Sequence, residues 1–151
     1  MKLKKTTLSR SIPMKLNQIK GIKLDILLAE SIMKLNLQDL TTRIRKIDGY
    51  DIVNGKCIVK TGFFTEAFSY KNESVYAALI RKLYTNLNYV EKNNNKLWHS
   101  KLDEFECYGR TPEEAVSRVI CCKAFGKTEI TKQDMDLSIF KVTALIDEDD
   151  E

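Results

Sequence analysis

The sequence contains one histidine and two prolines, and its apolar runs are short. A transmembrane helix needs about 20 consecutive apolar residues, so we expect no membrane span. The basic start at residues 1–5 is not followed by the continuous apolar stretch of a secretory signal peptide. We therefore expect a cytoplasmic protein, in a bacterial or other cytosolic compartment that keeps its thiols reduced.

Motifs for catalysis and metal binding are also missing. Cysteines stand at four positions with no C-x-x-C pair, and the single histidine is His99; the cysteines are Cys57, Cys107, Cys121 and Cys122. These ligands are too few for a zinc site, and a Ser or Cys nucleophile would have only His99 as its base. No Gly-x-x-x-x-Gly-Lys or Gly-x-Gly-x-x-Gly phosphate loop occurs. We expect no metal, no cofactor and no enzymatic activity.

Charge is unevenly distributed along the chain. The last five residues are all acidic, so residues 1–146 carry a net charge of +9, against +4 for the whole chain. Seven bases precede the first acid: Lys2, Lys4, Lys5, Arg10, Lys15, Lys20 and Lys23. A basic arm can bind phosphate, and an acidic tail can mask it or repel nucleic acid. Alternatively, both ends are solvated termini that aid solubility.

Apolar spacing and turn residues predict the main elements. One-sided apolar positions predict helices over 22–36 and 75–87. Asn54-Gly55 predicts a type I′ hairpin turn, and Asn93-Asn94-Asn95 separates candidate strands near 88–91 and 96–101. Further candidate strands are 42–47, 105–108 and 139–146. Thr111, Pro112 and Glu114 have the spacing of a capping box that begins a helix, which Gly126 ends.

These elements predict one small α+β domain with an antiparallel sheet and about three helices. The domain is expected over residues 21–146. A flexible basic arm over 1–20 precedes it, and an acidic tail over 147–151 follows it.

Several blocks of the sequence resemble the NinX-like proteins of tailed phages and prophages, a family of unknown function. The resemblance lies in an early Leu24-Asp25-x-x-x-Ala29 segment, in Trp98, in Gly109-x-Thr111-Pro112-x-x-Ala115-x-x-Arg118, and in Lys123-x-x-Gly126-x-x-Glu129. The Thr-Pro-Glu-Glu-Ala segment that begins at Thr111 is also similar to HicB-like antitoxin domains. The phage resemblance implies an accessory protein and carries over no catalytic residue.

Arginine and tyrosine side chains are the candidates for binding an anion or a partner. Arg43 and Arg45 would share one strand face, where a pair of guanidinium groups can clamp phosphate. The predicted ligand- or partner-binding residues are Arg43, Arg45, Arg81, Tyr84 and Arg118. The alternatives are a solvated charged face and aromatic core packing.

Three functions remain open on sequence grounds. The first is a phage-encoded host-defence antagonist that blocks an immune protein or sequesters a small anionic nucleotide signal, as a homo-oligomer in the signal-binding form. The second is a nucleic-acid-associated phage factor in recombination or regulation, which the basic arm favours. The third is a metal- or thiol-dependent enzyme, which the missing motifs disfavour.

Overall fold

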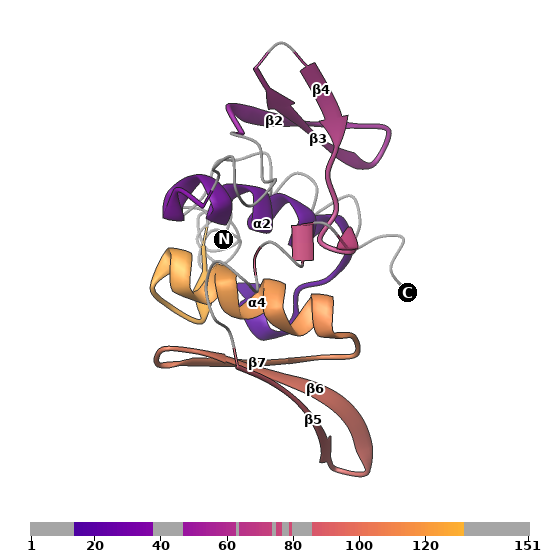
Figure 1. Cartoon of the computed structure of the whole chain (residues 1–151), viewed down its shortest axis with the longest axis vertical. Coiled ribbons are helices and arrows are strands. Elements are labelled where there is room, and N and C mark those ends of the chain that lie inside the picture. Colours follow the sequence, from indigo (N-terminus) through magenta and orange to yellow (C-terminus); the bar gives the residue numbers. More distant parts are fainter. Residues whose placement is uncertain are drawn as a thin grey trace, which may run out of the picture.

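Two antiparallel three-stranded sheets enclose a pair of helices (Figure 1). The computed structural model describes residues 14–37, 47–62, 64–73, 75–76, 79 and 86–131. The helices are α2 (Gly21–Leu35) and α4 (Pro112–Phe125). The first sheet contains β2 (Gly49–Val53), β3 (Lys56–Thr61) and β4 (Phe64–Ala67). The second contains β5 (Asn86–Lys92), β6 (Asn95–Leu102) and β7 (Phe105–Gly109).

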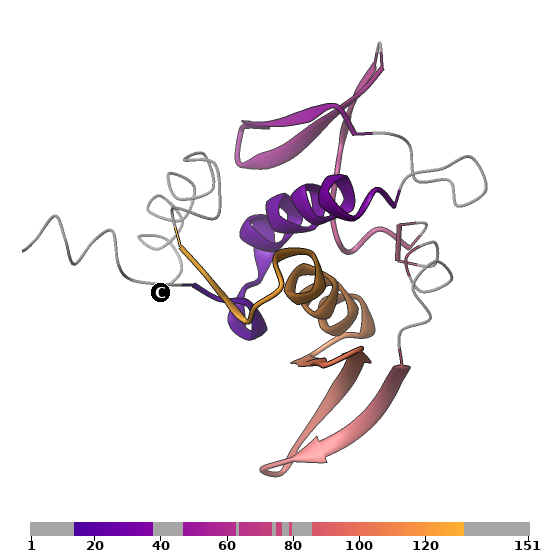
Figure 2. The same ribbon diagram turned by 90° about the vertical axis from the view of Figure 1, so that its left-hand side faces the viewer.

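The layers run sheet, α2, α4, sheet, as both ribbon views show (Figure 2). The helix α2 packs on β3 and on α4, and α4 packs on β6 and β7. Each helix therefore lies between two layers, and side chains are buried on more than one side of it. Ile26 of α2 is fully buried although it lies off the apolar stripe that predicts this helix, which consists of Leu24, Leu27, Leu28, Ile32 and Leu35.

The first described residues join the last ones in a small third sheet. Strand β1 (Met14–Lys15) pairs antiparallel with β8 (Glu129–Ile130), and the 3-10 helix η1 (Leu16–Gln18) follows. Leu16 is fully buried, and its N–H donates to Thr128 O at 2.8 Å. Residues 14–20, which the sequence predicts to be the end of a flexible arm, therefore belong to the packed domain.

The turn and capping signals of the sequence are confirmed. Asn54 and Gly55 both have positive φ between β2 and β3, and Asn93 and Asn94 do so between β5 and β6. The side chain of Thr111 caps α4 by accepting the Glu114 N–H at 3.1 Å. These signals succeed because they depend on neighbouring residues alone.

The number of helices differs from the prediction. The described residues contain two complete α-helices, α2 and α4, where about three helices are expected from the sequence. Residues 73, 75, 76 and 79 are also helical, which supports the start of the helix predicted over 75–87. Much of the stretch predicted as the helix over 75–87 lies outside the described residues, and residues 86–87 belong to β5. Leu87 fits the apolar spacing of a helix, but it lies opposite Ser100 in the hairpin that β5 forms with β6. The predicted strand over 139–146 and nearly all of the one over 42–47 also lie outside the described residues.

Candidate functional site

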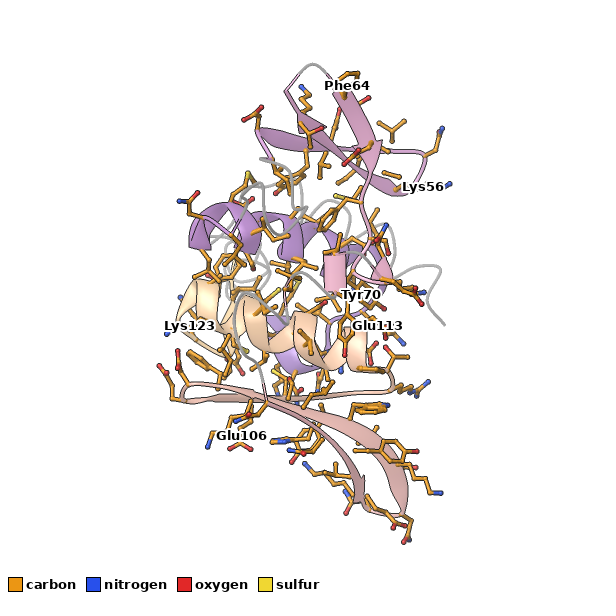
Figure 3. All side chains as sticks on the ribbon, in the orientation of Figure 1. Lys56, Phe64, Tyr70, Glu106, Glu113 and Lys123 are labelled. Carbon is orange, nitrogen blue, oxygen red and sulfur yellow. The ribbon has the colours of Figure 1, made fainter. Side chains whose placement is uncertain are left out.

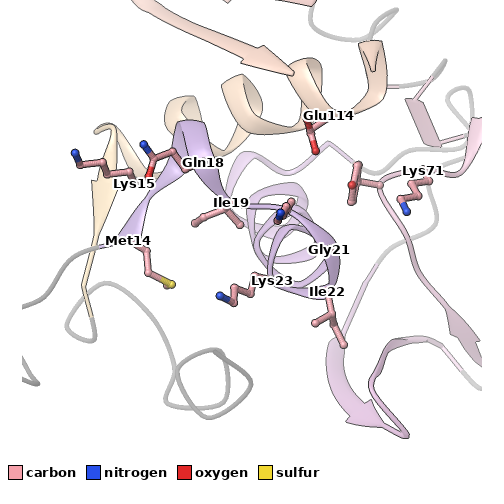
Figure 4. A pocket seen from close by; sticks show the side chains of 11 residues that line it. Met14, Lys15, Gln18, Ile19, Gly21, Ile22, Lys23, Lys71 and Glu114 are labelled. Atoms are coloured by element: carbon pink, nitrogen blue, oxygen red, sulfur yellow. The ribbon is translucent and has the colours of Figure 1, made fainter. Parts of the chain in front are cut away.

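A cationic pocket of about 550 Å³ lies where η1 leads into α2 (Figure 4). Among the described residues that line it are four lysines and one acidic residue, Glu114; the lysines are Lys15, Lys20, Lys23 and Lys71. Figure 4 looks along α2 from its start, with Glu114 on one side, Lys71 on another and Lys23 on a third. Pockets of this size hold drug-sized and nucleotide-sized molecules.

The start of α2 adds partial positive charge to this pocket. Lys20 is the N-cap residue, its side chain makes no capping hydrogen bond, and the first turn contains no acidic residue. Gly21 begins the helix with φ +66, a conformation that glycine adopts without strain. Backbone N–H groups at the start of a helix lack partners within the helix and favour anions.

The turn that carries Tyr70 and Lys71 is fastened to α2 by a carboxylate. The Tyr70 N–H donates to Asp25 Oδ1 at 2.8 Å, across 45 positions of sequence. Lys71 Nζ lies 5.9 Å from the centroid of the Tyr70 ring. Burial raises the pKa of Tyr70, and the charge of Glu114 adds to this, while a hydrogen bond with the Gly21 backbone opposes it. Asp25 thus holds one wall of the pocket against the helix that forms another.

We expect Asp25→Asn to remove a pH dependence of stability. Burial raises the pKa of the Asp25 carboxyl above 3.8, although hydrogen bonds from Tyr70 and Ser69 oppose the shift. The folded protein therefore binds a proton more tightly than the unfolded chain, and the free energy of unfolding falls as the pH rises from 3.8 through the raised pKa. The amide that replaces the carboxyl would stay neutral and still accept the Tyr70 N–H, so this fall should be absent in the variant.

Urea unfolding of both proteins at a series of pH values above about 4 measures this difference. Asp25→Ala is the control for the hydrogen bond, because it leaves the Tyr70 N–H without its acceptor and should destabilise by about 1–3 kcal/mol. An equal pH slope in wild type and Asp25→Asn would contradict the assignment.

A second, smaller hollow of about 370 Å³ shares part of this wall. Gln18, Lys20 and Glu114 line both hollows, and Arg110 and Arg118 line only the second. Glu114 Oε1 accepts the Arg110 N–H at 2.8 Å and lies 3.5 Å from Arg118 Nη1. The Glu114 carboxylate, which is the one that the described residues contribute to the cationic pocket, is therefore already engaged by neighbouring donors.

Arg118 connects three elements behind this wall. Its Nε–H donates to Ile19 O at 2.9 Å, and its Nη1–H donates to Tyr108 O at 2.6 Å. The residue is 9% exposed, and burial lowers the pKa of its guanidinium, an effect that Glu114 opposes. Asn17 Oδ1 accepts the Tyr108 N–H at 2.8 Å, so both main-chain groups of Tyr108 have side-chain partners.

Four of the five residues that the sequence nominates fall outside the described residues. These are Arg43, Arg45, Arg81 and Tyr84. Arg118 lines the second hollow, but its described hydrogen bonds go to two main-chain carbonyls, those of Ile19 after η1 and of Tyr108 in β7. The pocket instead contains Lys15, Lys20 and Lys23, which belong to the basic run before the first acid, and Lys71, which only a long-range contact brings near them.

His99 lies away from the pocket, in the middle of β6. Its Nε2 is 2.8 Å from Glu106 Oε1 on β7, which makes a cross-strand pair. On the other face of the hairpin, the rings of Trp98 and Tyr89 lie with centroids 5.0 Å apart. Within the described part of the chain, no three His, Cys, Asp or Glu residues gather as metal ligands would.

No protein-family model matches the sequence, and no curated protein matches it. The resemblance to NinX-like phage proteins therefore stays a prediction. None of the helices in the described ranges combines the length and the apolar character that a membrane crossing requires.

Proposed function

We propose that the chain is a binding protein without catalytic activity, and that it takes a phosphate-bearing ligand of nucleotide size in the cationic pocket. The observation that supports this is the convergence of four lysines on one pocket, where Glu114 is the single carboxylate among the described lining residues and is itself engaged by the Arg110 main-chain N–H and by the Arg118 guanidinium. The N-terminus of α2 supports it further, because its main-chain N–H groups and the helix dipole favour an anion at the same place.

Charge and size together favour a small anion over other ligands. Lysine ammonium groups bind phosphate oxygens as point charges without a fixed geometry, which suits a ligand with several phosphate groups. A volume of about 550 Å³ lies within the usual range for small-molecule sites.

This proposal is the signal-sequestering form of the phage host-defence antagonist that the sequence suggests. In that function, the protein lowers the free concentration of an anionic nucleotide signal by holding it. The alternative function, in which the chain accompanies nucleic acid in recombination or regulation, is an outcome of the test below. The form that blocks an immune protein predicts no binding of the small anions or of DNA.

Titration calorimetry with ATP and with inorganic pyrophosphate, at low salt, tests the proposal. Lys20→Gln should weaken binding of either probe about tenfold, because a hydrogen bond to a charged group is lost. Lys20 is the choice because it lines both hollows and stands at the start of α2. A third titration with a short single-stranded DNA measures the nucleic-acid alternative, which predicts tighter binding and a steeper dependence on salt.

Lys56→Gln is the matched control, since Lys56 is an exposed lysine at the β2–β3 turn, far from the pocket (Figure 3). It removes the same charge and should leave the affinity unchanged. An equal loss of affinity in both variants would mean that the binding is a non-specific effect of net charge. Absence of binding to all three probes would exclude the cationic pocket as an anion site.

A further inference from the structure

Two of the four buried cysteines meet at the interface between β7 and α4. Cys107 Sγ lies 3.6 Å from Cys122 Sγ, and the two residues are 0% and 1% exposed. Cys121 is in hydrogen-bond contact with Ser31 of α2 instead, and Cys57 lies in β3. Cys107 of β7 and Cys122 of α4 are thus the one pair of thiols in contact among the described residues.

We propose that Cys107 and Cys122 form an oxidation site, at which a peroxide converts the two thiols into an intramolecular disulfide between β7 and α4. The sulfur atoms must approach by roughly 1.6 Å to reach the S–S bond length of about 2.0 Å. Strand β7 is the last strand in the order β5-β6-β7, so among the described strands it pairs only with β6. Rotation of the two cysteine side chains, with small adjustments of the backbone around them, would have to close this distance.

In the proposed reaction, the Cys122 thiolate reacts first. The hydrogen bond between the thiols lowers the pKa of Cys122 and raises that of Cys107. The Cys122 thiolate attacks one peroxide oxygen, the O–O bond breaks, and the other oxygen leaves as hydroxide, which takes up a proton to become water. Cys122 is then a sulfenic acid.

In the second step, Cys107 sulfur attacks the Cys122 sulfur. The S–O bond breaks, and the hydroxyl group leaves as water with the proton from the Cys107 thiol. Two thiols and one peroxide therefore give one disulfide and two waters. Burial makes access the slow part of the reaction, so a small peroxide should react faster than a bulky disulfide reagent.

The disulfide would reinforce an existing contact behind the cationic pocket. Tyr108 follows Cys107 in β7, and Arg118, which donates to Tyr108 O, precedes Cys122 by one helical turn. The crosslink would close the chain from 107 to 122, which by loop entropy lowers the unfolding equilibrium constant on the order of a hundredfold. Oxidation would thus stabilise the wall that carries Arg118.

Treatment of the folded wild-type protein with hydrogen peroxide, followed by intact mass and tryptic mapping without reductant, tests the site. The expected result is a loss of about 2 Da and one crosslinked pair of peptides, 102–110 with 119–123. Fragmentation of that pair should place the bond at Cys122 rather than Cys121. Stability to urea should rise on oxidation and return to its starting value after reduction.

Cys122→Ser and Cys107→Ser should abolish the crosslink, while Cys57→Ser and Cys121→Ser, which also remove a buried thiol, should keep it. The wild-type map decides the matter even where a serine variant folds poorly. A bond at Cys121, a bond between two chains, or a gain of oxygen without a crosslink would overturn the proposal. So would thiols that stay reduced in the folded protein under conditions that oxidise the unfolded chain.

Discussion

Replacing Arg118 with methionine should lower the free energy of unfolding by about 3–5 kcal/mol, the usual effect of removing one partner from a buried charged network. Three acceptors would lose a donor: Ile19 O, Tyr108 O and, at longer range, Glu114 Oε1. Methionine fills a similar volume, so the loss would report hydrogen bonds and charge rather than a cavity. Urea unfolding of the variant and the wild type provides the measurement.

Arg118→Lys should recover only part of this stability. A single ammonium group cannot reproduce the planar guanidinium, which reaches two carbonyl oxygens on different elements. Arg110→Met is the matched control, because Arg110 is an exposed arginine close by in sequence, and it should change stability by less than about 0.5 kcal/mol. If Arg118→Met were as stable as Arg110→Met, the structural role of Arg118 would be contradicted, and the ligand-binding role that the sequence suggests would be the one left to test.

Gly109→Ala should be the other strongly destabilising change, with a loss of about 3 kcal/mol from overpacking. A Cβ atom at this position would lie 2.6 Å from Ala115 N and 2.9 Å from Glu114 Cβ. The obstructing atoms belong to the first turn of α4, so the helix start would have to move. That movement would disturb the Thr111 cap and the bond from the Arg110 N–H to Glu114.

Gly49→Ala is the control for this prediction. Gly49 also lies at the end of a strand, has no positive φ, and has nothing within 4 Å of the position that an alanine methyl group would occupy. The two alanine variants should therefore differ in their thermal midpoints by several degrees, with Gly109→Ala the lower. Similar midpoints would mean that α4 and β7 tolerate a wider separation than their close approach suggests.

Local signals in the sequence predict much of the fold, and the reason lies in their chemistry. Positive φ at Asn54 and Gly55 and the cap at Thr111 need no distant partner. Residues 14–20 show the opposite case. Leu16 and Ile19 are too few to make a periodic pattern, and their burial arises from contact with α4 and pairing near Thr128.

The candidate site was less accessible from the sequence, because it depends on contacts between distant segments. A run of bases before the first acid indicates Lys15, Lys20 and Lys23. Nothing in the sequence places Lys71 beside them, since that position depends on the bond from the Tyr70 N–H to Asp25. Arg118 shows a further limit of prediction from sequence. Its charge and its position in the motif suggest a ligand-binding residue, and only its hydrogen bonds to main-chain carbonyls reveal a structural role.

The side-chain partners of Tyr108 also affect how this protein meets copies of itself. An outer strand with unpaired main-chain groups is a template on which another chain can add a strand, and repeated addition leads to fibrils. At Tyr108 that template is blocked, because Asn17 accepts from its N–H and Arg118 donates to its carbonyl. A neighbouring chain would have to displace both side chains before it paired there. The guanidinium and the amide thus protect the β7 side of this sheet from edge-to-edge polymerisation.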